Sequence, residues 1–179
     1  IINIIGFVLY LINMLLYNYT AEANVDKFLT IISLVGGSLG ILLAIVLFDR
    51  KSVKDNMMSR VFVICLFVIQ LVMFLFLKGA NGEKITFAFW EFFAEHKILI
   101  IYSVIINFAA FAVDKINACE GRSRIRIITL LGIAFAGGSI GAILGMYIFR
   151  HKTRVDYFTV GVPLIMIMQA VVIFYLMNL

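Results

Sequence analysis

Long apolar runs separated by short charged segments are the feature that most constrains how this chain can fold. The runs approach the roughly 20 residues that an α-helix needs to cross the hydrocarbon core of a bilayer. Of the 179 residues, 64% are hydrophobic and 14% are charged, which is too little polar surface for a water-soluble domain. The sequence therefore predicts an all-α, polytopic integral membrane protein with six transmembrane helices. The expected spans are residues 1–19, 28–48, 61–77, 98–113, 127–149 and 157–177.

Two of these spans carry the same unusual cluster of small residues. The pattern Gly-Gly-Ser-x-Gly begins at Gly36 and again at Gly137, and Phe48 matches Phe149 at the same offset of 101 residues. This repetition predicts an internal duplication with three spans in each copy. The expected parts are a first three-helix repeat (1–78), a joining loop with an aromatic interfacial helix (79–97) and a second three-helix repeat (98–179).

An odd number of spans in each copy has a geometric consequence. The second copy must enter the membrane from the side opposite to the first, as in transporters built from inverted repeats. Basic residues are almost evenly shared between the two sets of loops, as an antiparallel duplication requires. The slight excess favours both termini in the cytoplasm.

The glycine clusters have two interpretations. Small residues let transmembrane helices approach closely, so each cluster can mark a helix crossing near the axis between the copies. Paired glycines can also let a helix unwind and present backbone groups to a solute. The residues of the expected path are Gly36, Gly37, Ser38, Gly137, Gly138 and Ser139.

Amide side chains also lie inside the apolar runs, and four of them match between the two copies. Gln70 matches Gln169 after a two-residue gap, and Asn13 matches Asn107 after a longer one. Buried amides usually form hydrogen bonds between helices. Their occurrence in both copies also makes them candidates to line a shared path.

Basic residues follow the glycine helix of each copy. A helix C-terminus suits cations, and such a cluster can anchor the helix at the interface or bind an anion or a lipid headgroup. The candidate residues are Arg50, Lys51, Arg150, His151, Lys152 and Arg154.

Asp114 and Lys115 follow the fourth expected span. An acid at the membrane boundary can act in ion coupling, or it can form an ion pair with a nearby arginine, Arg124 being the central candidate beside Arg122 and Arg126. In the last span, Pro163 predicts a kink.

Signatures of enzymes and metal sites are missing from the sequence. Neither a zinc-binding nor a nucleophile motif occurs, and Cys65 and Cys119 stand alone. We therefore expect no enzymatic activity, no cofactor and no metal. The net charge is +5, and the basic residues lie between the apolar runs, where they would meet lipid headgroups. We therefore expect contact with membrane lipids and no binding of nucleic acid.

The second half resembles the YsdA-like family of small bacterial membrane proteins, a domain of unknown function. The resemblance covers about residues 98–176, and the family's Pro-Glu is replaced here by Arg126-Ile127. It implies a bacterial inner membrane location. The matching residues are Asp114-Lys115, Arg124-Ile125, Gly137-Gly138-Ser139-Ile140-Gly141, Arg150-His151-Lys152-Thr153 and Phe158.

Three functions are compatible with these features. The first is a small transporter or channel for an ion or a small anionic solute, with the glycine segments at mid-depth and the basic ends at the mouths. The alternative is a non-transporting subunit that anchors or regulates a partner protein or binds lipid headgroups. The possible partners are a further copy of the chain or another protein. A lipid-modifying enzyme is least favoured, because no nucleophile or metal set is present.

Overall fold

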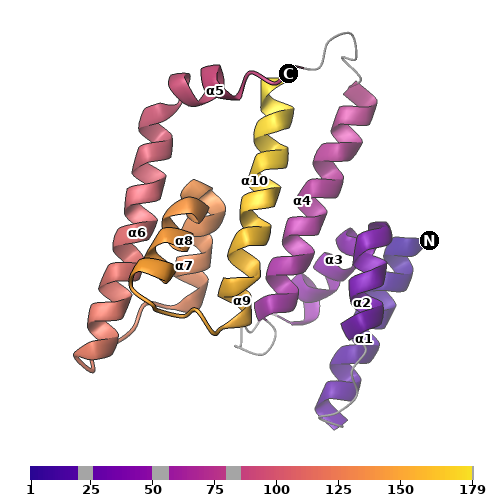
Figure 1. Cartoon of the computed structure of the whole chain (residues 1–179). Helices are drawn as coiled ribbons and strands as arrows, with labels where there is room; N and C mark the ends of the chain where they lie inside the picture. The colour runs from indigo at the N-terminus through magenta and orange to yellow at the C-terminus, as the bar shows by residue number, and fades with distance from the viewer. Residues whose placement is uncertain (20–25, 50–56, 80–85, 179) are drawn as a thin grey trace. The chain divides into compact units, whose positions relative to one another are not determined.

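The computed structural model describes residues 1–19, 26–49, 57–79 and 86–178, and every element within these ranges is a helix (Figure 1). The chain divides into two compact units, unit 1 (Ile1–Leu75) and unit 2 (Phe76–Leu179). Each unit is described by itself.

Five helical segments are long and apolar enough to cross a membrane, which confirms that this is an all-helical protein of the membrane type. The sixth expected span, α1 (Ile2–Tyr19), is apolar over Ile2–Leu16 and does not reach the required length. The five segments are Phe28–Phe48, Met57–Gly79, Ile100–Cys119, Ile127–Ile148 and Asp156–Met177.

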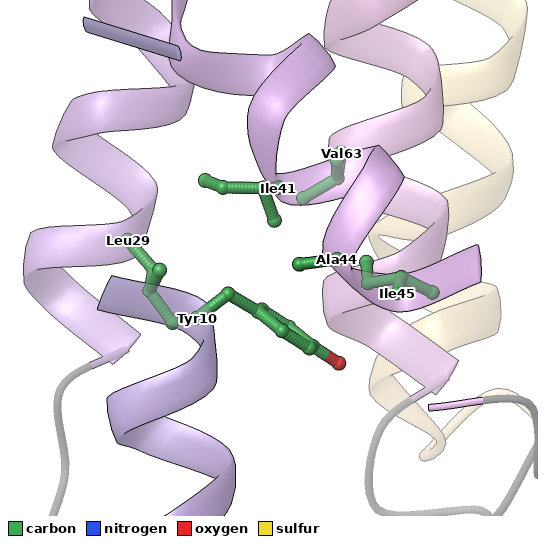
Figure 2. Close-up of a cluster of buried hydrophobic side chains, with 6 residues drawn as sticks. All are labelled: Tyr10, Leu29, Ile41, Ala44, Ile45 and Val63. Carbon is green, nitrogen blue, oxygen red and sulfur yellow. The ribbon is translucent and has the colours of Figure 1, made fainter. Parts of the chain in front are cut away.

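Unit 1 contains α1, an interrupted helix and α4. The interrupted helix consists of α2 (Asp26–Ile32), the wide turn η1 (Ser33–Gly37) and α3 (Ser38–Phe48), and α4 is Met57–Gly79. Buried side chains from all four α-helices meet in one core (Figure 2), in which residues from α3 lie between those of α1, α2 and α4. These residues are Tyr10, Leu29, Ile41, Ala44, Ile45 and Val63.

Unit 2 repeats the interrupted helix and adds a short helix at one end. The short helix α5 (Phe89–Glu95) contacts both α6 (Lys97–Cys119) and α10 (Gly161–Met177), and it lies across their ends in Figure 1. The interrupted helix packs against α6 and α10. Its parts are α7 (Ile127–Ile133), the wide turn η3 (Ala134–Gly138) and α8 (Ser139–Ile148), and the short α9 (Asp156–Thr159) precedes α10.

Large apolar side chains cover the outside of the described helices. Val46 and Leu47 on α3, and Ile101 and Ile105 on α6, are all more than half exposed. In water such a surface would drive aggregation, whereas acyl chains would cover it without cost. The exposed surface therefore supports placement of these helices in a membrane.

The expected end of the fourth span and the expected kink in the last span are both wrong. The fourth span was expected to end before Asp114, but α6 continues to Cys119, so Asp114 and Lys115 lie in a helix and not in a loop. The predicted kink at Pro163 is also displaced. The break lies at Val160, between α9 and α10, and Pro163 occupies the first turn of α10, where a missing N–H is tolerated.

Candidate functional site

The candidate site is built around the break in the interrupted helix of unit 2. Gly137 has φ 116° and ψ −8°, a left-handed conformation that L-residues with a side chain rarely adopt. The helix therefore ends before Gly137 and begins again at Ser139. A break of this kind removes backbone carbonyl groups from the regular helical ladder, and they need other partners within a membrane.

Three side chains, those of Gln169, Ser103 and Asn107, supply those partners. Gln169 on α10 donates from Nε2 to the carbonyl oxygens of Ala134 (2.6 Å) and Phe135 (3.1 Å). Its Oε1 accepts a 2.5 Å hydrogen bond from the hydroxyl of Ser139. On α6, Ser103 Oγ donates to the carbonyl of Gly137 (3.3 Å) and Asn107 Nδ2 donates to that of Gly138 (2.7 Å).

Unit 1 contains the same arrangement. Gly36 has φ 112°, and Gln70 donates from Nε2 to the carbonyl oxygens of Ser33 (2.6 Å) and Leu34 (3.3 Å). The hydroxyl of Ser38 donates to Gln70 Oε1 at 2.5 Å. The predicted match between Gln70 and Gln169 is therefore a match in structure, since both brace a glycine break.

The predicted match between Asn13 and Asn107 is wrong. The residue of unit 1 that corresponds to Asn107 is Gly6. Gly6 lies against the carbonyl of Gly37, and Asn107 binds the carbonyl of Gly138, which is the counterpart of Gly37. Asn13 then falls 101 residues before Asp114. Two aromatic contacts support this register. The Phe7 ring contacts the Phe48 ring in unit 1, and the two residues that lie 101 positions later contact each other in unit 2. The counterparts are Phe108 and Phe149.

Close helix packing accompanies the break in both units. A methyl group added at Gly40 would overlap the carbonyl oxygen of Asn3, and one added at Gly141 would overlap that of Val104. In unit 1 the contact is completed by a hydrogen bond from Gly40 N–H to Asn3 Oδ1 at 3.1 Å. Close packing of small residues is thus present within each unit, between α3 and α1 in unit 1 and between α8 and α6 in unit 2. The sequence predicted this packing at a crossing of the second and fifth spans, near the axis between the copies.

A cavity of about 860 Å³ lies in unit 2, where η3 meets α5, α6 and α10. Its polar wall consists of the break and of the side chains that brace it. Gly137 and Ser139 belong to the break, and Ser103 and Gln169 bind it from α6 and α10. Its remaining wall is mostly apolar and rich in phenylalanine, and its ionisable side chains are Glu91, Glu95 and His96 from the α5 region. The phenylalanines are Phe89, Phe92, Phe93 and Phe135.

A second polar cluster lies beyond the C-terminal end of α8. The carboxylate of Asp114 is fully buried, and its Oδ2 accepts from His151 Nε2 (2.8 Å) and Lys152 Nζ (2.6 Å). Its Oδ1 accepts from the backbone N–H of Ile125 at 2.8 Å. The Lys152 ammonium also lies 4.9 Å from the centre of the Phe158 ring. We call Asp114, His151 and Lys152 the Asp114 cluster.

This cluster differs from the expected ion pair. Among the described residues, Asp114 pairs with His151 and Lys152 rather than with Arg122, Arg124 or Arg126, and Arg122 pairs with Glu120 instead. The error arose because α6 was expected to end before Asp114. The longer helix directs the carboxylate into unit 2, toward the loop after α8.

The basic residues after the glycine helix do not act as one group. His151 and Lys152 bind Asp114, whereas Arg150 and Arg154 are exposed. Arg150 and Lys152 both have positive φ values, 45° and 60°, so the chain turns sharply here. Arg50 and Lys51, the expected counterparts in the first half, lie outside the described residues.

The structure thus gathers most of the predicted residues in three places, namely the two breaks and the Asp114 cluster. The break of unit 2 brings Gly137, Gly138, Ser139, Asn107 and Gln169 together, and the break of unit 1 does the same for Gly36, Gly37, Ser38 and Gln70. Asn13 belongs to neither break, and Lys115 and Arg124 have no ion pair with Asp114.

Ser103, Asn3, Glu91 and Glu95 were not among the predicted residues. Asn3 could have been found, since it is an amide inside the first apolar run, as Asn13 is. The two glutamates gave no signal, because only the fold of α5 over α6 and α10 brings them to the cavity.

Comparison with known proteins places the Asp114 cluster and the break within a family. Residues 104–158 match the family described as protein of unknown function DUF1294. The uncharacterized protein YsdA of Bacillus subtilis (strain 168) is 39% identical over 79 residues, which cover 42% of this chain and 89% of that protein. No solved structure gives a significant match. The chain therefore belongs to the YsdA-like family, whose shared domain has no assigned function.

Proposed function

We propose that this protein is a small membrane transporter or channel with a solute site at the interrupted helix. The observation that carries the proposal is the broken helix of unit 2, whose Gly137 and Ser139 line a cavity of about 860 Å³. Irregular backbone at membrane depth is tolerated where it is buried in protein or lines a cavity. Discontinuous helices at substrate sites are a recurrent feature of transporters.

The side chains around the break support a binding role. Gln169 and Ser103 fix the conformation of the break by hydrogen bonds and also line the cavity. A solute would therefore meet a preformed wall and would not have to break the helix itself. Preformed sites bind at lower entropic cost.

We further propose that the two units insert in opposite directions, as an inverted repeat. Each unit has a glycine break braced by a glutamine from the last helix of that unit. Three spans in each unit, with α1 as the first, would bring the two breaks to similar depth from opposite sides.

The cavity of unit 2 does not favour the anionic cargo that the basic helix ends suggested. Within the part of the chain that the structure describes, the ionisable side chains in its lining are two glutamates and a histidine. His151 and Lys152 bind Asp114 beyond the far end of α8, roughly 15 Å along the helix from Ser139.

Solute flux into proteoliposomes tests this function. The purified chain would be assayed with potassium chloride, choline chloride, sodium lactate, glycerol and ethidium, against protein-free liposomes. We expect flux of at least one solute, and we expect Ala170→Phe, which adds bulk at the cavity wall, to reduce it at least fivefold. Ile167→Phe is the matched control, because Ile167 is 55% exposed on the same helix and does not line the cavity. No flux of any solute would contradict the proposal.

A non-transporting membrane subunit is the second candidate, and one observation favours it. Trp90 is 88% exposed and Phe87 is 71% exposed near α5, and aromatic residues of this kind are enriched at protein and membrane interfaces. Pull-down of a stable partner from detergent-solubilised native membranes, lost with Trp90→Ala and retained with Ile167→Ala, would support this candidate.

A further inference from the structure

We infer that the cavity of unit 2 binds a lipophilic monovalent cation, of the quaternary ammonium or aromatic phosphonium type. The inference rests on the proposed function, because it names the class of solute that the site would accept. It depends on three features of the cavity. These are its apolar wall, the sign of the charge at its edge, and the use of its side-chain donors in hydrogen bonds within the protein.

The wall of the cavity suits a bulky apolar ligand. Phe92 and Phe93 lie on α5 with ring centroids 6.2 Å apart in an edge-to-face arrangement, and Phe135 lines the cavity from η3. A volume of about 860 Å³ is in the range of pockets that enclose drug-sized molecules. Phenylalanine faces attract cations through their negative quadrupole, and they do not attract anions in this way.

The edge of the cavity carries negative charge. Glu91 and Glu95 are four residues apart on α5, so they lie on the same helical face, and both line the cavity. The third ionisable side chain of the lining, His96, stacks on Phe92 with ring centroids 4.4 Å apart. Among the described residues that line the cavity there is no lysine or arginine, so the carboxylates would attract a cation and repel an anion.

The side-chain hydrogen-bond donors deeper in the cavity are already in use. Gln169 uses both ends of its amide on Ser139 and on the carbonyl oxygens of the break, and Ser103 is bonded to Ile100 and Gly137. A ligand that needs hydrogen-bond donors from the protein, such as an anion, would have to displace these contacts. A cation whose charge is shielded by apolar substituents needs no hydrogen-bond partner, so it fits this cavity better.

Equilibrium binding to the full chain in zwitterionic lipid nanodiscs tests the inference. The probes are tetraphenylphosphonium and tetraphenylborate, which have the same shape and opposite charge, each measured against empty nanodiscs of the same lipid. We expect tetraphenylphosphonium to bind at least tenfold more tightly to the protein than tetraphenylborate does. Equal or tighter protein binding of tetraphenylborate would overturn the inference. This comparison uses the unaltered protein, so it does not depend on the folding of any variant.

Substitutions then locate the site. Changing both glutamates, Glu91→Gln with Glu95→Gln, should weaken tetraphenylphosphonium binding about tenfold. Glu120→Gln, the same chemical change at an exposed position outside the cavity, should leave it within twofold. Phe93→Leu should weaken binding severalfold, whereas Trp90→Leu on the same helix should not, because Trp90 does not line the cavity. Unchanged binding in the double glutamate variant would overturn the assignment.

The binding assay also separates this inference from the proposed function. Charge-selective binding without flux of any solute would retain the cation site and contradict transport. Flux of another solute, blocked by Ala170→Phe, without selective binding of tetraphenylphosphonium would retain transport and contradict the cation site.

Discussion

Asp114 shows how one buried charge organises the end of a helix. Its carboxylate is fully buried near the C-terminus of α6 and accepts hydrogen bonds from His151, Lys152 and the N–H of Ile125. Lys152 reaches this position with a positive φ of 60°, which most residues avoid. The attraction to Asp114 offsets that conformational cost, so the loop after α8 depends on the carboxylate.

We predict that Asp114→Asn destabilises the protein by about 3–5 kcal/mol, because it leaves the largely buried Lys152 without its counter-charge. Thermal unfolding in detergent would measure the loss. Adding Lys152→Met to this variant should recover part of it, as expected for two residues that interact. Glu120→Gln, which removes an exposed pair with Arg122, should change stability by less than about 1 kcal/mol. Equal losses in the two single variants would contradict this account.

The glycines at the two breaks give a second prediction at this scale. Gly36 and Gly137 have φ values of 112° and 116°, and a methyl group added at either position meets no severe clash. Gly36→Ala and Gly137→Ala should therefore each cost about 1–2 kcal/mol from backbone strain alone. Gly132→Ala is the control, because Gly132 is in α7 with open space around it and should gain up to about 1 kcal/mol in helix propensity.

At the scale of elements, the packing of α6 against α8 depends on Gly141. A methyl group there would overlap the Val104 carbonyl, and backbone atoms cannot move aside as a flexible side chain can. We predict that Gly141→Ala costs about 1–3 kcal/mol by separating the two helices. Thermal unfolding beside Gly132→Ala would check this, and a neutral Gly141→Ala would show that α6 and α8 do not pack so closely.

The two glutamine braces can be compared directly. Gln70→Met and Gln169→Met each remove the donor that two break carbonyls share and the acceptor of a serine hydroxyl. Each should cost about 1–3 kcal/mol, since freed polar groups in a membrane are costly. Ile167→Met, on the exposed side of α10, should be near neutral. A loss in one unit only would mean that the two breaks are not stabilised in the same way.

The sequence predicted these elements well where periodicity and composition determine them. The long apolar helices and the glycine repeat follow from solvent and from packing, and both could be recognised without coordinates. The conformation of the break, the matching of Gly6 to Asn107, and the partners of Asp114 depend on contacts between distant residues. Those contacts are tertiary, so local pattern alone did not determine them.

For the molecule as a whole, the inverted repeat that we propose predicts on which side of the membrane each end of a span lies. In a Cys119→Ser background, cysteines at Phe48 and Arg150 mark the ends of the two glycine helices, and both native side chains are exposed. A membrane-impermeant maleimide should label them from opposite sides. Labelling from the same side would contradict the inverted repeat.

The number of spans needs a separate measurement. A cysteine at Ile2, in the same background, should be labelled from the same side as one at Phe48 if α1 crosses the membrane. Labelling from opposite sides would mean that α1 does not cross, which leaves the five spans that helix length supports.

In the register of 101 residues, Asp114 in unit 2 corresponds in position to Asn13 in unit 1. A carboxylate that binds Lys152 in one unit is therefore replaced by a neutral amide in the other. One gene that encodes both halves lets selection act on each half separately, so a residue required in one half can be discarded in the other. Once the halves have diverged in this way, they are no longer interchangeable. Two copies of either half joined together would not reproduce the whole protein.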